Sequence, residues 1–348
     1  MTTLYVGARP VLVSRTTSGW RKQMPNPLKI ATLGFWHVHA GDYSRQAQEH
    51  PGTDLVAVWD TDVERGKAGA EAFGVPYTSD LDALLASDID GVVITTATDE
   101  HRDLMVKVAQ AGKHIFTEKV LAPTVAEAEE IIAAADDNGV KLTVSLPRLA
   151  HGYTNAIREV LDSGQLGQVT YARVRLSHDG AIGRDGKDGW LPHRFFEPKA
   201  AIGGALTDLG CHPVYLTQLF LGANIETVSA TYRSIAGLGL EDNAVVVVGY
   251  PNQTIGVIEA GFASPNPFTI EIFGTESTLT YTDAGNVLKV GGEEVPVPEH
   301  SLDPFGQWVE HITNGTRADD NISRALELTR LVVAANEAAT TNTVVAYS

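Results

Sequence analysis

Three residues whose side chains can move protons stand where a folded chain could bring them together. Asp208 and His212 are four residues apart in a stretch expected to be helical, which would place both on one helix face. Lys119 ends a β-rich run, where the crevice of a parallel α/β sheet should open. Lysine, histidine and carboxylate groups can all take the hydroxyl proton when an alcohol is oxidised by hydride transfer. Each also has an ordinary structural explanation, as a surface charge, a buried histidine or a helix cap.

A turn near the start of the chain shows part of a dinucleotide-binding pattern. Glycines after the first strand of a Rossmann fold let the backbone approach a pyrophosphate at the next helix N-terminus. Gly34 ends the first β-rich run, but it is the only glycine of G-x-G-x-x-G that this chain keeps. We expect His37 or His39 to donate to phosphate oxygens in place of the missing glycines. Trp36 is too bulky for close backbone approach and should displace the pyrophosphate.

An acidic residue closes the second β-rich run. Asp60 stands where a Rossmann fold places the carboxylate that accepts hydrogen bonds from the adenosine ribose. Its negative charge would repel a 2′-phosphate, so we expect NAD to be preferred, with NADP possible because Arg65 could accommodate the phosphate. An ordinary turn aspartate is the alternative.

The elements that would position these residues follow from hydrophobic patterning. Five β-rich runs alternate with helical stretches, the pattern of parallel βαβ units: 28–34, 54–60, 91–96, 114–118 and 141–145. The clearest helix begins with a capping box at Thr124 and Glu127 and ends at Gly139. After about residue 165 long strand-like stretches dominate: 169–177, 227–233, 243–250, 254–262 and 268–273. One strong helix near 204–220 and two final helices, around 304–314 and 322–339, complete the pattern.

These patterns predict an α/β Rossmann domain with a doubly wound parallel sheet, and a C-terminal α+β domain with a large, mainly antiparallel sheet. We place the first domain at residues 28–148 and the substrate and oligomerisation domain at 149–348. Residues 1–27 are expected to be a disordered extension, and Met24 is an alternative start of translation.

Three segments carry a family resemblance. The first, residues 94–101 and 111–120, includes A-G-K-H and then Glu118, Lys119 and Val120. The second, residues 203–212, reads G-G-A-L-T-D-L-G-C-H, and the third, residues 272–279, reads I-F-G-T-E-S-T-L. Together they resemble the Gfo/Idh/MocA oxidoreductases over residues 28–348. Val120 in place of the usual proline puts the local backbone geometry in doubt.

The resemblance implies an NAD(P)-dependent dehydrogenase that oxidises a hydroxyl of a sugar, a sugar derivative or an inositol-like cyclic polyol. It implies His212 as general acid/base, Asp208 as its orienting and pKa-raising partner, and Lys119 as the residue that polarises the reacting oxygen. The implied cofactor contacts are Gly34, Trp36, His37, His39, Asp60, Thr95, Thr96, His101 and Glu118. The implied substrate contacts are Arg148, Trp190, His193 and Arg194. A homodimer or homotetramer is also implied.

Composition restricts the partners. The net charge of −17 disfavours nucleic acid, because nucleic-acid binding relies on Lys and Arg contacts with phosphate. The single cysteine cannot form an intrachain disulfide, which favours the cytoplasm. No stretch approaches the roughly 20 apolar residues of a membrane span, so we expect no membrane association.

Two other function classes fit part of the pattern. His37 and His39 resemble the H-x-H of metal-dependent hydrolase barrels, and on an extended strand they could bind zinc. We expect no metal, because the following pattern is that of a doubly wound sheet. A dinucleotide-binding regulatory protein without turnover is the other alternative, although such relatives usually lose the catalytic lysine or histidine, and both are kept here.

Overall fold

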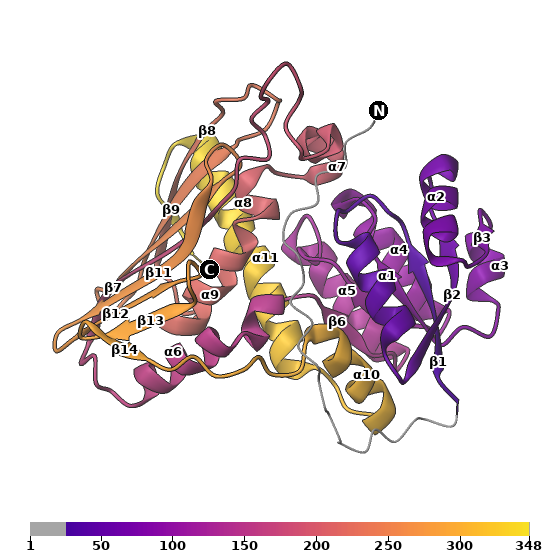
Figure 1. Cartoon of the computed structure of the whole chain (residues 1–348), viewed down its shortest axis with the longest axis horizontal. Coiled ribbons are helices and arrows are strands. Elements are labelled where there is room, and N and C mark those ends of the chain that lie inside the picture. The colour runs from indigo at the N-terminus through magenta and orange to yellow at the C-terminus, as the bar shows by residue number, and fades with distance from the viewer. Residues whose placement is uncertain (1–25, 348) are drawn as a thin grey trace.

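The computed structural model describes residues 26–347. The predicted extension up to residue 25, and the alternative start at Met24, lie outside this range. Figure 1 shows two layered parts side by side, a helix-flanked parallel sheet and a broad second sheet, with α11 (Asp319–Thr341) running between them.

The first part is a Rossmann-type sheet, as predicted. Within the described residues its strand order is β3-β2-β1-β4-β5-β6, and every neighbouring pair is parallel. Its strands are β1 (Leu28–Leu33), β2 (Thr53–Trp59), β3 (Tyr77–Thr78), β4 (Gly91–Ile94), β5 (His114–Thr117) and β6 (Leu142–Val144). Its helices are α1 (Ala40–Glu49), α2 (Val63–Phe73), α3 (Leu81–Leu85), α4 (His101–Gln110) and α5 (Val125–Asp137). The order reverses between β1 and β4, and in such sheets ligands bind at the carboxyl ends of the strands beside that point.

Local signals explain why these elements form where they do. Ile30, Val92 and Val93 are completely buried, as expected for strands covered by helices on both faces. The N-cap of α5 is Thr124, whose hydroxyl accepts the Glu127 N–H at 3.2 Å, which confirms the predicted cap.

The second part is built on a mixed sheet that is mostly antiparallel. In the described chain its order is β14-β13-β12-β11-β7-β10-β9-β8-β15, and only β7 and β10 pair in parallel. Its strands are β7 (Val169–Ser177), β8 (Thr227–Arg233), β9 (Asn243–Gly249), β10 (Ile255–Gly261), β11 (Asn266–Gly274), β12 (Thr278–Thr282), β13 (Val287–Val290), β14 (Glu293–Val295) and β15 (Val345–Ala346). Its other helices are α6 (Gly152–Asp162), α7 (Pro198–Ala201), α8 (Ala205–Asp208) and α9 (Cys211–Leu221). Helix α10 (Pro304–Asn314) packs on β5 and β6 of the Rossmann sheet. Strands β12 to β15 were not predicted.

Helices cover one face of this sheet. The side chains of β9 alternate, with Val246 and Val248 buried and Val245 and Val247 exposed. Helices α9 and α11 lie on the side that faces the Rossmann part (Figure 1), and no helix formed by residues 26–347 covers the opposite face. Among the described residues no helix combines the length and the apolar character that crossing a bilayer requires.

The predicted helix near residues 204–220 is interrupted, which corrects the expectation that Asp208 and His212 share one helix face. Helix α8 ends at Asp208 and α9 begins at Cys211. Gly210 lies between them in close contact with α8 and β10. A Cβ there would be 2.7 Å from the Leu206 carbonyl oxygen and 2.8 Å from Ala260 Cβ. The backbone keeps helical dihedrals at Gly210, but its N–H donates to the Ala205 carbonyl oxygen and the His212 N–H to that of Leu209, so the regular i,i+4 hydrogen-bond pattern is lost here.

Candidate active site

Lys119 and Asp208 meet where the two parts of the protein join. Lys119 follows β5, and its side chain is almost fully buried. Its Nζ donates to Asp208 Oδ1 at 2.8 Å and to the Asp208 carbonyl oxygen at 2.5 Å. Burial opposes the charge on both groups, but their mutual attraction outweighs it. The pKa of Lys119 is therefore raised, and the pKa of Asp208 lies well below its usual value.

His212 is buried nearby, but Asp208 does not orient it. Its Nδ1 lies 2.9 Å from the hydroxyl of Tyr215, three residues along α9. Burial, and then the positive charges of Lys119 and Arg148, hold the pKa of His212 well below its ordinary value. The prediction that Asp208 raises the pKa of His212 is therefore wrong, because the helix break directs Asp208 toward the Rossmann part. Tyr215 was missed, although its i+3 spacing from His212 was a usable signal.

The two histidines of the first turn face carboxylates. His37 Nε2 lies 3.1 Å from Asp208 Oδ1, and His39 Nδ1 lies 3.0 Å from Glu118 Oε2. Burial lowers the pKa of His37, whereas the pKa of His39 is raised because Glu118 outweighs its burial. Burial raises the pKa of Glu118, but attraction to His37, His39 and Lys119 outweighs it, so the pKa lies well below its usual value. The expected phosphate donors are thus engaged with acidic side chains.

The carboxyl edge of the Rossmann sheet retains features that fit a dinucleotide. Gly34 has φ +86°, and a Cβ there would lie 2.5 Å from Thr96 Cγ2, so the tight turn requires glycine. Thr95 Oγ1 donates to the Gly34 carbonyl oxygen at 2.5 Å. Within the described chain, Thr96 Oγ1 and His101 Nε2 are buried without a hydrogen-bond partner. Unpaired polar atoms at this edge are what a bound cofactor would satisfy.

His101 also has a structural contact. Its Nδ1 lies 3.1 Å from the Val120 carbonyl oxygen and 3.2 Å from that of Leu121, the residues after Lys119. The Lys119–Val120 peptide, where the family has proline, is cis.

Trp36, where a glycine was expected, packs against the second part of the protein. Its ring stacks on Phe195 with centroids 4.9 Å apart, and its carbonyl oxygen accepts from Arg194 Nε at 2.5 Å. Arg194 thus reaches the cofactor turn rather than the Lys119–Asp208 pair.

Asp60 does not present a free acceptor. Its carboxylate accepts from the Phe35 and Asp62 N–H groups at 2.6 and 2.8 Å. It also accepts from Arg65 Nε and Nη2 at 2.8 and 2.6 Å. These four donors match the capacity of a carboxylate. The Arg65 guanidinium, 26% exposed, is therefore the more accessible group of this pair.

The remaining predicted substrate contacts are dispersed. Arg148 Nη1 donates to the Tyr153 hydroxyl at 3.2 Å, and its guanidinium lies 4.3 Å from the Phe268 ring centre. Trp190 is 61% exposed, and the His193 side chain is also exposed. No contact of either with Lys119 or Asp208 is found in the described chain.

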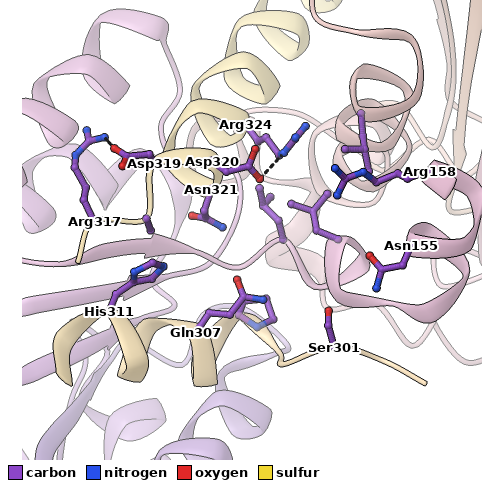
Figure 2. Close-up of a pocket in the computed structure, with 15 residues that line it drawn as sticks. Asn155, Arg158, Ser301, Gln307, His311, Arg317, Asp319, Asp320, Asn321 and Arg324 are labelled. Carbon is purple, nitrogen blue, oxygen red and sulfur yellow. Dashed lines mark hydrogen bonds and ion pairs between the residues drawn. The ribbon is translucent and has the colours of Figure 1, made fainter. Parts of the chain in front are cut away.

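Of two cavities considered, one is lined by Lys119 and Asp208 and the other is not. A small cavity is lined by Trp36, His37, Thr98, Lys119, Val120, Phe195, Ala201, Thr207 and Asp208. A larger cleft of about 450 Å³ lies between α6, α10 and α11 (Figure 2). Two of its three arginines, Arg317 and Arg324, are paired with neighbouring carboxylates, and none of the predicted site residues lines it. We therefore take the small cavity as the candidate site.

Comparisons with known proteins identify the family to which both parts are similar. Residues 29–146 match the family described as oxidoreductase family, NAD-binding Rossmann fold, and residues 154–280 match the GFO/IDH/MocA C-terminal domain. Scyllo-inositol 2-dehydrogenase (NAD(+)) of Bacillus subtilis is 28% identical, over 72% of this chain and 71% of that protein. A dTDP-3,4-didehydro-2,6-dideoxy-alpha-D-glucose 3-reductase of Streptomyces violaceoruber is 26% identical, over 83% of this chain and 89% of its own.

A solved structure extends the agreement across both parts. The NAD complex of GenD2 from gentamicin A biosynthesis superposes with a TM-score of 0.78 at 26% identity, covering 97% of this chain and all of that one. This relationship excludes the hydrolase barrel, because β1 belongs to an open parallel sheet. The chain belongs to the Gfo/Idh/MocA family of NAD(P)-dependent oxidoreductases.

Proposed function

We propose that this protein is a dehydrogenase that oxidises a hydroxyl group of a sugar, a sugar derivative or a cyclic polyol. The observation that carries the proposal is the Lys119–Asp208 contact of 2.8 Å at the carboxyl edge of the Rossmann sheet. The similarity to inositol and sugar oxidoreductases supports the substrate class. NAD, when bound, supplies the acceptor for the hydride.

The side chains suggest a division of roles. The Lys119 ammonium donates to two oxygens of Asp208 and is held as a hydrogen-bond donor, suited to polarising a substrate oxygen. His212 is neutral because of its burial, and Tyr215 fixes its Nδ1. With its ring proton on Nδ1, donated to the Tyr215 hydroxyl, the neutral imidazole can accept the substrate hydroxyl proton at Nε2 and return it in the reverse direction. Asp208 holds the lysine in place.

A substrate panel tests the proposal. Purified protein is incubated with inositols, aldoses and sugar derivatives, with NAD or NADP, and reduced nicotinamide is followed by absorbance. Turnover of at least one polyol or sugar is expected. Dinucleotide binding without any turnover would favour the regulatory alternative, and neither binding nor turnover would refute both.

We further propose that the helix-free face of the large sheet forms a homodimer or homotetramer contact. This face exposes Val245, Val247, Ile255 and Phe273, which are 37–44% accessible. Light scattering should give a dimer or tetramer mass, and Val247→Lys should shift it toward the monomer. The cytoplasmic location and the lack of nucleic-acid partners remain predictions.

A further inference from the structure

Three potential metal ligands converge beside the proposed active site. One ligand atom from each of His37, His39 and Glu118 lies within 4.8 Å of the others. Glu118 Oε2 is 3.0 Å from His39 Nδ1 and 3.5 Å from His37 Nδ1. Ligands bound tetrahedrally to Zn²⁺ at about 2.0–2.1 Å stand roughly 3.3–3.4 Å from one another. These spacings therefore suit donors around one small cation.

The hydrogen bonds of His37 prepare its ring for this role. Nδ1 accepts the backbone N–H of His39 at 3.2 Å, so the ring proton belongs on Nε2, which donates to Asp208 Oδ1 at 3.1 Å. The Nδ1 lone pair is directed at the His39 N–H, and Glu118 Oε2, which is also an acceptor, lies 3.5 Å from the same nitrogen. A cation would take over that lone pair from the long contact with His39. Metal-bound histidines commonly donate their other N–H to a carboxylate, as His37 does.

The charges around these residues also favour a bound cation. Glu118 and Asp208 are two buried or mostly buried carboxylates, and Lys119 is their shared positive partner. The two oxygens of Glu118 are divided, because Oε1 accepts the Lys119 backbone N–H at 3.0 Å while Oε2 faces the histidines. Two carboxylates therefore face a single lysine, and Glu118 Oε2 is turned toward the two histidines rather than toward that lysine. A bound cation would offset part of this negative charge.

We propose that His37, His39 and Glu118 bind a divalent transition-metal cation, with zinc as the first candidate, and that Asp208 positions His37 as a ligand. Two histidines and one carboxylate leave a fourth position open, as in catalytic zinc sites. That position suits water or a hydroxyl oxygen of a small polar ligand. The inference revises the expectation of no metal, and it goes beyond the dehydrogenase proposal because zinc binding can be measured without NAD and without turnover. His37, His39 and Glu118 were also expected to contact the cofactor, so the cation and the dinucleotide would bind at the same edge of the sheet.

Metal titration tests the site directly. Tag-free full-length protein is stripped with a chelator and titrated with Zn²⁺ by calorimetry, and separately with Co²⁺ to record its visible absorption. We expect one equivalent to bind with a Kd below about 1 μM. His39→Gln and Glu118→Gln should each weaken binding at least about 100-fold, and Asp208→Asn about 10- to 100-fold with an altered Co²⁺ spectrum.

The control is a second pair of histidines. His151 and His300 stack with ring centres 4.4 Å apart and could bind zinc adventitiously. His300→Gln should keep the full affinity and stoichiometry. The proposal fails if the native protein binds no stoichiometric zinc, if His39→Gln binds as tightly as the native protein, or if His300→Gln abolishes binding. His39 is 38% exposed, so its variant should fold even if Glu118→Gln does not, and thermal melts check this.

Discussion

Replacing Lys119 by methionine should both destabilise the protein and stop its chemistry. Methionine fills most of the same space but removes the ammonium that lies 2.8 Å from Asp208 Oδ1. Breaking a buried ion pair by removing one partner costs about 3–5 kcal/mol. Asp208 is 20% exposed and keeps its contact with His37, so we expect a loss at or just below the lower end of this range, about 2–3 kcal/mol.

The double variant tests whether the stranded charge causes this loss. In Lys119→Met/Asp208→Asn the unpaired carboxylate is gone, so the free energy of unfolding should recover part of the loss seen in Lys119→Met. Urea denaturation measures both. Lys67→Met is the matched control, since its pair with Glu64 on α2 is largely exposed and should contribute less than about 1 kcal/mol. A Lys119→Met protein as stable as the Lys67→Met protein would refute the reasoning.

The same variant has a kinetic consequence. Acid–base groups contribute about 100- to 10,000-fold to turnover, equivalent to roughly 2.7–5.4 kcal/mol of activation free energy. On a substrate identified by the panel, Lys119→Met and His212→Ala should each lower kcat by that order, with NAD binding nearly unchanged. The kcat of the Lys119→Met/His212→Ala double variant should be little lower than that of the slower single variant. Near-normal kcat in both single variants would show that another group handles the proton.

Three further predictions concern the cofactor edge and stability. Arg65→Gln should weaken NADP binding about 10-fold more than NAD binding in calorimetric titrations, because a charge-assisted contact with a 2′-phosphate is lost; equal effects would argue against this role. Burial, with Arg148 and His300 nearby, lowers the pKa of His151 to about 4, so the unfolded state binds the extra proton first. Stability should therefore fall as the pH drops from about 6.5 to 4, and His151→Gln should flatten the profile of melting temperature against pH. Gly34→Ala should destabilise by at least about 2 kcal/mol because of its positive φ and the contact with Thr96, whereas Gly41→Ala in α1, with no atom within 4 Å, should be neutral or stabilising.

The fold was predictable because its signals are local. The buried strands of the Rossmann part appear as short apolar runs, and the capping box of α5 fixes a helix start at Thr124. The break between α8 and α9 was not predictable. A single glycine within a helical pattern does not show whether the helix is interrupted, and the contacts of Gly210 with Leu206 and Ala260 appear only in the folded protein. Short edge strands such as β14 (Glu293–Val295) are too polar and too brief to stand out.

The sequence predicted which residues belong to the site better than it predicted which of them contact one another. Motif positions indicated Lys119 and Asp208, and the structure brings them within 2.8 Å. That His37 also reaches Asp208 depends on packing between residues 171 positions apart, which no local pattern encodes. The pairing of Asp60 with Arg65 is local, but the sequence does not show that the arginine occupies the carboxylate predicted to accept from the ribose.

Asp208 links the chemistry to the arrangement of the two parts. It belongs to α8 of the second part, yet its carboxylate accepts from Lys119 at the end of β5 and pairs with His37 after β1. The contact of Arg194 with Trp36 adds a second polar link across the same boundary. Because both links converge on the cofactor edge, loss of the Asp208 contacts should loosen the boundary where substrate and dinucleotide must meet. Hydrogen exchange in α8 should therefore rise in Asp208→Ala and Lys119→Met, and unchanged protection there would show that apolar packing alone holds the two parts together.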